Sequence, residues 1–210
     1  MANLTDLTSK EFLTELASAA PAPGGGGGAA MAGALAAALS SMVCNLTLGK
    51  EKFAAQEAEV QSVLVKAERA RERLLELVQE DAAVFNSFMS CYKLPKATDE
   101  EKAVRTAAIR AAAKKAAEVP LAIARESFAV LELADELVVC GNPGVITDGA
   151  CSGLLARAAL RCAEYNVRIN LGLTKDADWN AQVQAELEAM LKQAEALEAK
   201  LLAVTDKALA

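Results

Sequence analysis

The stretch PAPGGGGGAAMAGALAAALSSMVCNLTL spans residues 21–48 and contains no charged side chain. Its prolines end any preceding helix, because proline lacks an amide hydrogen and restricts the residue before it. The alanine-rich part, about 28–48, predicts a helix, since alanine has the highest helix propensity. Small residues at every fourth position form a narrow stripe, against which a helix of the same chain or of a dimer partner packs closely. The stripe consists of Ala29, Gly33, Ala37 and Ser41.

The rest of the chain has the same helical character. Apolar residues recur with helical spacing, and we find no alternating strand pattern and no internal repeat. Thr98 and Glu101 form a predicted capping box, and Pro120 predicts a kink or break. We therefore expect an all-α fold, an up-and-down bundle of five to six long helices, with residues 1–210 as a single domain. The further helices are expected at about 5–19, 51–91, 98–139, 148–170 and 178–209.

Composition excludes several classes of function. The 210 residues contain no histidine, which removes Ser-His-Asp and Cys-His catalysis and the commonest zinc ligand, and we predict no metal site. The formal net charge of −6 argues against a nucleic-acid partner or an acidic membrane surface. Any acid–base chemistry must therefore come from carboxylates, lysine, tyrosine, cysteine or water.

The five cysteines and the N-terminus favour a cytoplasmic protein. An odd number of cysteines without CxxC spacing indicates free buried thiols in a reducing compartment, and Cys151 and Cys162 are expected to share a core face. The polar N-terminus does not resemble a signal peptide. The uncharged segment 29–48 is rich in alanine rather than leucine, so a buried helix is favoured over a membrane span.

The glycine run Gly24, Gly25, Gly26, Gly27 and Gly28 allows two interpretations. It lacks both the preceding strand of a dinucleotide-binding motif and the Lys-Ser/Thr of a phosphate-binding loop. Glycines entering a helix let bare N–H groups face a ligand at the positive end of the helix dipole. The alternative, slightly favoured by the residues alone, is a tight crossover with positive φ at several positions.

Asp81 interrupts the apolar stripe of the predicted helix 51–91. The stripe runs through Leu77 and Val78 to Phe85 and Phe88, so Asp81 occupies a core-facing position. Burying a carboxylate without a partner costs several kcal/mol or raises its pKa. Two interpretations are evenly balanced: an ion pair with an arginine such as Arg110 or Arg157, or a general acid or base with a tuned pKa.

Other polar residues in apolar surroundings are further candidates. Lys50 follows the uncharged helix, where it either complements the helix dipole or lies at the mouth of a pocket. Thr147 and Asp148 either cap the helix 148–170 or, with Asn142, point into a pocket. Asn166 and Asn170 lie four apart on one face of a mainly apolar helix. They indicate an interhelical hydrogen-bond network, the commoner use, or recognition of a heterocycle's edge.

Together these residues resemble the cyclodeaminase/cyclohydrolase family, which includes the C-terminal half of formiminotransferase-cyclodeaminase and stand-alone methenyltetrahydrofolate cyclohydrolases. The resemblance covers about residues 7–173, and the order of its motifs is more specific than any one of them. The motifs are PAPGGG (21–26), LTLGK (46–50), DAAVF (81–85), AAEVPL (116–121), GN (141–142), TDG (147–149) and NVRIN (166–170).

The resemblance implies an all-α homodimer or higher homo-oligomer that acts on a tetrahydrofolate derivative and needs no other cofactor. It implies either hydrolytic opening of 5,10-methenyltetrahydrofolate to 10-formyltetrahydrofolate, or cyclodeamination of 5-formiminotetrahydrofolate with release of ammonia. Asp81 matches the family's catalytic carboxylate, and Lys50 and Asp148 are expected to join it in catalysis. The glycine run then forms a binding surface, and the expected substrate-binding residues are Gly24, Gly25, Gly26, Gly27, Gly28, Asn142, Thr147, Asn166 and Asn170. The alternative is a non-enzymatic helical scaffold or a folate-binding protein.

Overall fold

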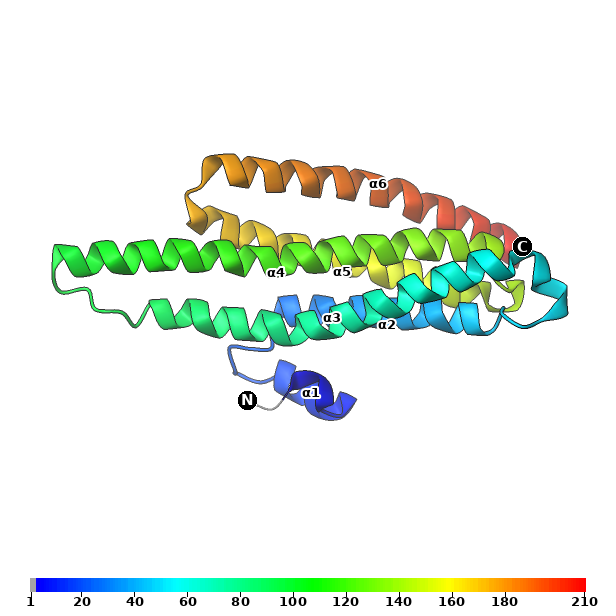
Figure 1. The fold of residues 1–210 in the computed structure, drawn as a ribbon, viewed down its shortest axis with the longest axis horizontal. Helices are drawn as coiled ribbons and strands as arrows, with labels where there is room; N and C mark the ends of the chain where they lie inside the picture. The colour runs from blue at the N-terminus through cyan, green and yellow to red at the C-terminus, as the bar shows by residue number, and fades with distance from the viewer. Residues whose placement is uncertain (1–2) are drawn as a thin grey trace.

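The computed structural model describes residues 3–210, and every regular element in that part of the chain is helical (Figure 1). The all-α prediction is therefore confirmed. Five of the six α-helices are long, and three short 3-10 helices cover Leu4–Asp6, Glu51–Gln56 and Pro143–Val145. The α-helices are α1 (Ser9–Leu16), α2 (Gly25–Asn45), α3 (Glu57–Cys91), α4 (Asp99–Cys140), α5 (Ile146–Thr174) and α6 (Ala177–Leu209).

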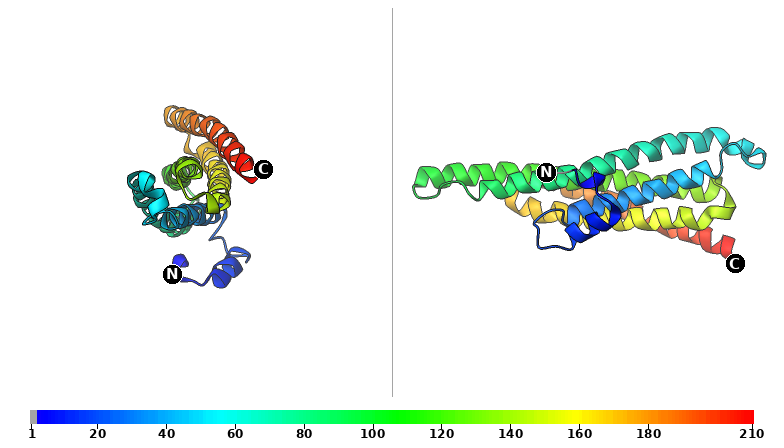
Figure 2. Two further views of the ribbon diagram at one scale, coloured as in Figure 1. Left: turned by 90° about the vertical axis from the view of Figure 1, so that its right-hand side faces the viewer. Right: turned by 90° about the horizontal axis from the view of Figure 1, so that it is seen from below.

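Successive long helices run in opposite directions, as an up-and-down bundle requires (Figure 1). α2, α3, α4 and α5 form the central four-helix arrangement, and α6 packs against α4 and α5. The end-on view in Figure 2 places α1 and α6 on opposite sides of these four helices. The hairpin of α3 and α4 extends past the start of α2 and the end of α5 (Figure 1), which creates a step in the side of the bundle.

The small-residue stripe of α2 packs inside the chain. All four of its members are buried. A Cβ atom added at Gly33 would lie 2.9 Å from Ser127 Oγ on α4 and 3.1 Å from Leu74 Cδ2 on α3. The stripe therefore allows α2 to approach two neighbouring helices of its own chain, and it is not available for packing across a dimer axis.

Several helix boundaries differ from those expected. α2 begins at Gly25 rather than near Gly28, so most of the glycine run is helical. The capping box of Thr98 and Glu101 is confirmed, with each side chain accepting from the other residue's backbone N–H. α4 continues through Pro120 without a break.

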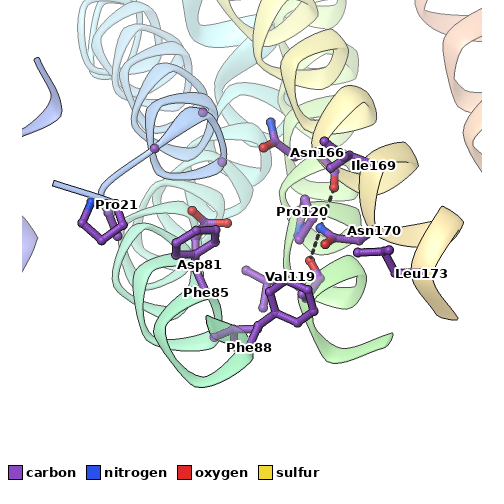
Figure 3. Close-up of a pocket in the computed structure, with 16 residues that line it drawn as sticks. Pro21, Asp81, Phe85, Phe88, Val119, Pro120, Asn166, Ile169, Asn170 and Leu173 are labelled. Carbon is purple, nitrogen blue, oxygen red and sulfur yellow. Dashed lines mark hydrogen bonds between the residues drawn. The ribbon is translucent and has the colours of Figure 1, made fainter. Parts of the chain in front are cut away.

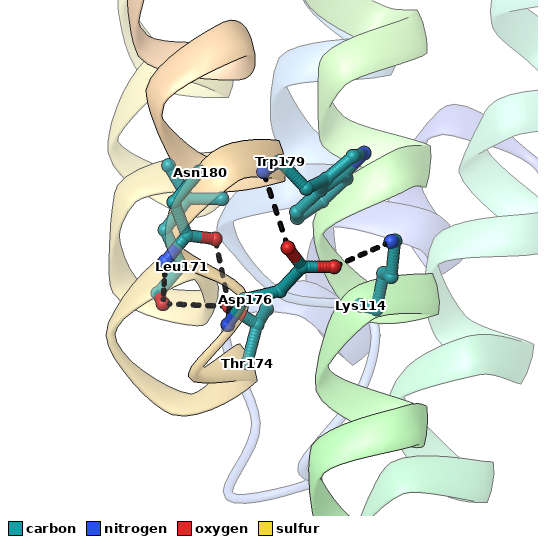
Figure 4. A network of polar contacts seen from close by, with 6 residues as sticks. All are labelled: Lys114, Leu171, Thr174, Asp176, Trp179 and Asn180. Carbon is teal, nitrogen blue, oxygen red and sulfur yellow. Dashed lines mark hydrogen bonds and ion pairs between the residues drawn. The ribbon is translucent and has the colours of Figure 1, made fainter.

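The connection between α5 and α6 is shorter than the loop predicted between the last two helices, and a polar network surrounds it (Figure 4). The connection is only two residues long, and Lys175 adopts the left-handed conformation with φ 58°. Asp176 caps α6 by accepting from the Trp179 N–H at 3.2 Å, and its other oxygen lies 2.9 Å from Lys114 Nζ on α4. Thr174 Oγ1 donates to Asn180 Oδ1 at 2.7 Å. These contacts fix the start of α6 against α4 and α5.

The five cysteines are all free. Cys44 and Cys140 are buried, and desolvation raises their pKa values to about 12 and about 11. Cys151 and Cys162 are exposed, so the expectation that they face the core is wrong. They lie three turns apart on the solvent side of α5, because the buried side of this helix is occupied by alanine, leucine and valine.

α2 is the one helix within residues 3–210 that is long and apolar enough to cross a membrane, judged by length and composition alone. In the bundle, 61% of its most apolar 18-residue window is buried. The buried position of this helix agrees with the interpretation that it belongs to the core.

Candidate active site

A pocket of about 410 Å³ lies where α2 begins and α5 ends, beside α3 and α4 (Figure 3). This volume falls in the range of roughly 300–1,000 Å³ that small-molecule sites occupy. Most of the lining is apolar, with a few polar groups directed inward. The polar members are Asp81, Asn166, Asn170 and the backbone of Gly24–Gly26, and the apolar members include Pro21, Phe85, Phe88, Val119, Pro120, Ile169 and Leu173.

Asp81 lies against the first turn of α2. The backbone N–H of Gly27 donates to Asp81 Oδ2 at 2.9 Å. A Cβ atom added at Gly26 would come within 2.6 Å of Asp81 Cγ, which is closer than real contacts allow. The absence of a side chain at Gly26 is therefore what lets the carboxylate from α3 reach the start of α2.

Desolvation raises the pKa of Asp81, and the hydrogen bond from Gly27 lowers it to a smaller extent. Within residues 3–210 no basic side chain pairs with this carboxylate. Arg157, one of the two arginines considered as partners, instead lies 3.3 Å from Glu198. The ion-pair interpretation of Asp81 is thus wrong. A half-buried carboxylate with a raised pKa is suited to accept and return a proton.

The glycine run forms a helix start and not a crossover. Gly24 is the N-cap of α2 in an extended conformation, and the Gly28 N–H donates to the Gly24 carbonyl at 2.9 Å. The one glycine with positive φ within residues 3–210 is Gly49, at 71°. Because the N–H groups of a first turn lack partners in their own helix, Gly25 and Gly26 present backbone donors at the pocket.

Asn170, on the pocket wall, supplies a hydrogen-bond donor that α4 itself lacks at Pro120. Pro120 has no N–H to give to the carbonyl of Ala116, four residues earlier. Asn170 Nδ2 donates to this Ala116 oxygen at 3.0 Å and to the carbonyl of Asn166 at 2.8 Å. The expected interhelical hydrogen bond is therefore present, and it explains why α4 continues through a proline.

The two asparagines also retain acceptors for a ligand. Asn166 Nδ2 donates to the carbonyl of Cys162 at 2.8 Å. Both amide nitrogens are therefore bound to backbone, while neither Oδ1 atom accepts a hydrogen bond within residues 3–210. Since both side chains line the pocket, these oxygens can accept from the N–H groups of a heterocycle.

Gly27 and Gly28 do not line this pocket, although Gly27 donates to Asp81, and four further predicted site residues lie far from it within one chain. Lys50, Asn142, Thr147 and Asp148 are at the opposite end of the bundle, where α2 and α4 end and α5 begins. α2 has 21 residues, so its two ends are about 30 Å apart. Consecutive helices of an up-and-down bundle alternate in direction, which places these motifs far from Asp81.

Asn142 has a structural role at that far end. Its backbone N–H donates to Thr47 Oγ1 at 2.9 Å, and its Nδ2 donates to the carbonyl of Leu46 at 3.0 Å. It thereby joins the turn after α4 to the end of α2. Val145 is the N-cap of α5, so Thr147 and Asp148 lie in the first turn and do not cap the helix.

Sequence reasoning missed the apolar walls of the pocket. Phe85 and Phe88 continue the stripe that contains Asp81 and are therefore predicted to lie in the core. Phe88 is buried and Phe85 partly buried, and both also line the pocket. Their position one and two turns after the buried carboxylate was the available signal. No group of three or more His, Cys, Asp or Glu side chains in the described part of the chain is arranged to hold a metal ion.

Comparison with known proteins identifies relatives across nearly the whole chain. The chain is 45% identical over 194 residues to a methenyltetrahydrofolate cyclohydrolase of Methylorubrum extorquens, covering 92% of this chain and 93% of the relative. It is 33% identical to the formimidoyltransferase-cyclodeaminase of Sus scrofa, covering 92% of this chain and 36% of that longer protein. The crystal structure of a formiminotetrahydrofolate cyclodeaminase from Thermotoga maritima matches with a TM-score of 0.87 at 28% identity, covering 97% of this chain and 98% of that one.

The family model described as formiminotransferase-cyclodeaminase matches residues 8–189. The match includes the helix start at Gly25, the carboxylate of Asp81 and both pocket asparagines. With the fold and the sequence in agreement over this length, the chain belongs to the formiminotransferase-cyclodeaminase family.

Proposed function

We propose that this protein catalyses the hydrolytic opening of 5,10-methenyltetrahydrofolate to 10-formyltetrahydrofolate. The single observation that carries the proposal is Asp81, a carboxylate with a raised pKa held against a glycine helix start inside an apolar pocket. The similarity to a cyclohydrolase that this chain matches at 45% identity over almost its full length supports the choice of reaction.

The first step is the addition of water to the methenyl carbon. That carbon bridges two folate nitrogens in an amidinium-like cation and is electrophilic. Asp81 accepts a proton from water as the oxygen bonds to carbon, which yields a neutral tetrahedral intermediate and a protonated carboxyl. The negative carboxylate also stabilises the cationic substrate before the addition.

The second step breaks the bond between that carbon and N5. Protonated Asp81 delivers its proton to N5 as this nitrogen departs, and the hydroxyl of the intermediate loses its proton as the formyl carbonyl forms on N10. One proton is released in the whole reaction and Asp81 is restored. The reaction forms a C–O bond, breaks a C–N bond and transfers protons without any change of oxidation state, so we propose that no cofactor is required.

The pocket suits the shape of the substrate. The Oδ1 atoms of Asn166 and Asn170 accept from the N–H groups of the pterin ring, and Phe88 and Val119 contact the aromatic part that follows. The helix start at Gly25 allows close approach because it carries no side chain. Water is partly excluded by the apolar walls, which strengthens the electrostatic effect of Asp81.

Cyclodeamination is the second candidate reaction, favoured by the structural similarity to a formiminotetrahydrofolate cyclodeaminase over 97% of the chain. In that reaction a folate nitrogen attacks a formimino carbon and ammonia leaves, with Asp81 moving the protons. The test supplies the purified protein with each substrate separately and identifies the products by NMR and by an ammonia assay. We expect 10-formyltetrahydrofolate from the methenyl substrate. Release of ammonia from the formimino substrate alone would replace the first proposal by the second.

We further propose that the protein is a cytoplasmic homodimer. α2 has no charged residue, and together with α5 it exposes large apolar side chains on the bundle surface. These are Leu35, Met42, Leu154, Tyr165 and Ile169, here called the α2–α5 face, and they are 41–72% exposed. Ile169 also lines the pocket, so a second subunit on this face would narrow the mouth of the site.

A two-fold dimer also gives the distant motifs a place in the site. Leu35 is at the middle of α2, and a two-fold axis that passes near it at right angles to the helix would set the α2 helices of both subunits antiparallel. The end of α2 in one subunit then lies beside the start of α2 in the other. Lys50 and Asp148 of one subunit would approach the Asp81 pocket of its partner and join it in catalysis, with Asn142 and Thr147 nearby.

Subunit complementation tests this arrangement. Asp81→Asn and Lys50→Met proteins are each expected to be inactive, because each homodimer lacks one group in both sites. After dissociation and random reassembly, about one quarter of wild-type activity should return, since half of the dimers contain one intact site. No recovery in a mixture shown to contain hybrid dimers would place Lys50 outside the site.

A further inference from the structure

A second, smaller cavity adjoins the Asp81 pocket on the side of the α3–α4 hairpin. It has a volume of about 180 Å³, and its lining shares Val84 and Phe88 with the pocket. The remaining lining residues are Ser87, Ala111, Ala112 and Lys115. Val84 and Phe88 therefore stand between the Asp81 pocket and a second cavity, which reaches the side chain of a lysine.

Lys115 differs from its neighbour in what it contacts. Lys114 Nζ lies 2.9 Å from Asp176 Oδ2 and 4.8 Å from the centre of the Trp179 ring, so this lysine holds the start of α6. Lys115 is exposed, and within residues 3–210 its ammonium has neither an ion pair nor a hydrogen bond. A cation without a partner at the end of a cavity is available to an anionic ligand.

The surrounding hairpin has a positive charge in an otherwise acidic protein. Residues 86–117 contain seven Lys or Arg and three Asp or Glu, whereas the whole chain has a formal net charge of −6. This hairpin projects past the start of α2 and the end of α5, on which the pocket lies (Figure 1). An anionic ligand group is therefore attracted to this end of the pocket and away from the rest of the surface.

The geometry points to Lys115 as the residue that binds the carboxylate tail of the folate substrate, with the second cavity as its subsite. This inference rests on the proposed function, because it assigns one end of the same ligand. Lys115 would then determine specificity: it favours substrates that carry a glutamyl carboxylate and contributes nothing to the chemical step at Asp81.

The distances along α3 agree with this assignment. Asp81 and Phe88 are seven residues apart on one helix, which is about 10 Å. A benzoyl ring and the amide bond that follows it span a length of that order. With the methenyl carbon at Asp81, the ring lies against Val84 and Phe88, and the glutamyl carboxylates emerge at the second cavity beside Lys115.

The experiment compares two substrates that differ only in the tail. These are 5,10-methenyltetrahydrofolate and the corresponding methenyltetrahydropteroate carboxamide, here called the pteroate, in which an uncharged amide replaces the glutamate. We expect Lys115→Gln to raise KM for the folate about threefold to fivefold, as the loss of one partly exposed charge pair does. Its kcat for the folate and its KM for the pteroate should stay at wild-type values. Lys192→Gln is the matched control, because Lys192 is exposed on α6 outside both cavities and should leave all constants unchanged.

An equal rise of KM for both substrates, or no rise for either, would overturn the assignment of Lys115. Equilibrium dialysis of both ligands against the Asp81→Asn protein, with and without Lys115→Gln, measures the same preference without turnover. The folate should bind more tightly than the pteroate, and Lys115→Gln should remove the difference. If wild-type protein turned over neither substrate while this binding preference held, the proposed reaction would fail and the tail subsite would stand.

Discussion

Asp81 lies in the candidate active site, and the desolvation of its carboxylate lowers the stability of the folded protein. Its pKa is raised in the folded protein, so between the unfolded and folded pKa values the native state holds the extra proton. The free energy of unfolding therefore falls as pH rises through that interval, and the loss is complete above the folded pKa. Asparagine occupies the same space, stays neutral at every pH and still accepts from Gly27.

We accordingly predict that Asp81→Asn stabilises the protein at pH 8 by about 1 kcal/mol, the size of other gains made at functional positions. In a protein of this length this raises Tm by about 2–4 °C. The difference should disappear at a pH well below the pKa of aspartate in an unfolded chain, about 3.9, where residue 81 is neutral in both proteins. Thermal unfolding of both proteins across this pH range measures it, and a pH-independent difference would show that desolvation of the carboxylate is not its source.

Gly26 gives a second prediction at this scale. Gly26→Ala places a methyl group within 2.6 Å of Asp81 Cγ, so the carboxylate must move. We expect kcat to fall about 100-fold, the typical effect of a displacement of about 1 Å at a reacting group. Gly28→Ala is the matched control, because its Cβ would meet only Leu16 Cδ2, at 4.0 Å. Equal activity of the two variants would contradict the role given to Gly26.

The sequence identified Asp81 because a charged residue interrupting an apolar stripe needs an explanation. It did not reveal the partner of Asp81, since the Gly27 N–H lies 54 residues away and donates through its backbone. The choice between ion pair and acid–base group was likewise open. That choice depended on which charged side chains the fold brings to residue 81. Because arginine side chains are long enough to reach many positions, the sequence alone does not exclude an ion pair.

Among the elements, α4 depends on a side chain from α5. Asn170→Ala leaves the Ala116 carbonyl without a donor opposite Pro120, and we expect it to cost about 0.5–1.5 kcal/mol, the net value of one hydrogen bond, because Ala116 is only partly buried at the pocket wall. Pro120→Ala restores a backbone N–H at that turn. In the Pro120→Ala background Asn170→Ala should therefore cost less than half as much, measured by urea unfolding of the four proteins. Strictly additive effects would rule out this dependence.

Each long helix could be predicted from the sequence, because a long segment with apolar residues at helical spacing is enough to identify a helix. Boundaries were less predictable where tertiary contacts decide them. α2 starts within the glycine run because Asp81 accepts from its first turn, and α4 passes Pro120 because Asn170 replaces the missing donor. Neither contact leaves a local signal in the sequence.

For the whole molecule, the α2–α5 face leads to a prediction about assembly. Leu35→Glu places a charge at the centre of this face and should convert the dimer to monomers, because burying an unpaired charge is unfavourable. Light scattering after size-exclusion chromatography measures the mass. Val65→Glu is the matched control: Val65 is 63% exposed on α3, outside the face, and should leave the mass unchanged. An unchanged mass for Leu35→Glu would exclude this face as the interface.

At this scale the sequence predicted the bundle, but four of the twelve predicted site residues lie at the opposite end from Asp81 within one chain. The motifs around Lys50 and Asp148 were expected beside Asp81, although alternation of helix direction puts them about 30 Å away in the same chain. The positions of motifs along a chain do not indicate at which end of a bundle each one lies. Asn166 and Asn170 were placed correctly in the pocket because both occur on the final turns of one helix.

The most direct measurement is kcat/KM for the opening of 5,10-methenyltetrahydrofolate, followed by the decay of its absorbance, in wild type, Asp81→Asn and Glu80→Gln. Glu80 is the adjacent carboxylate, paired with Arg73 at 2.6 Å outside the pocket, so Glu80→Gln removes the same charge without touching the site. We predict a loss of about 100-fold to 10,000-fold for Asp81→Asn, as for other general acid–base groups, and near wild-type activity for Glu80→Gln. Wild-type activity in Asp81→Asn would show that this carboxylate does not carry the proton, and the mechanism would be wrong.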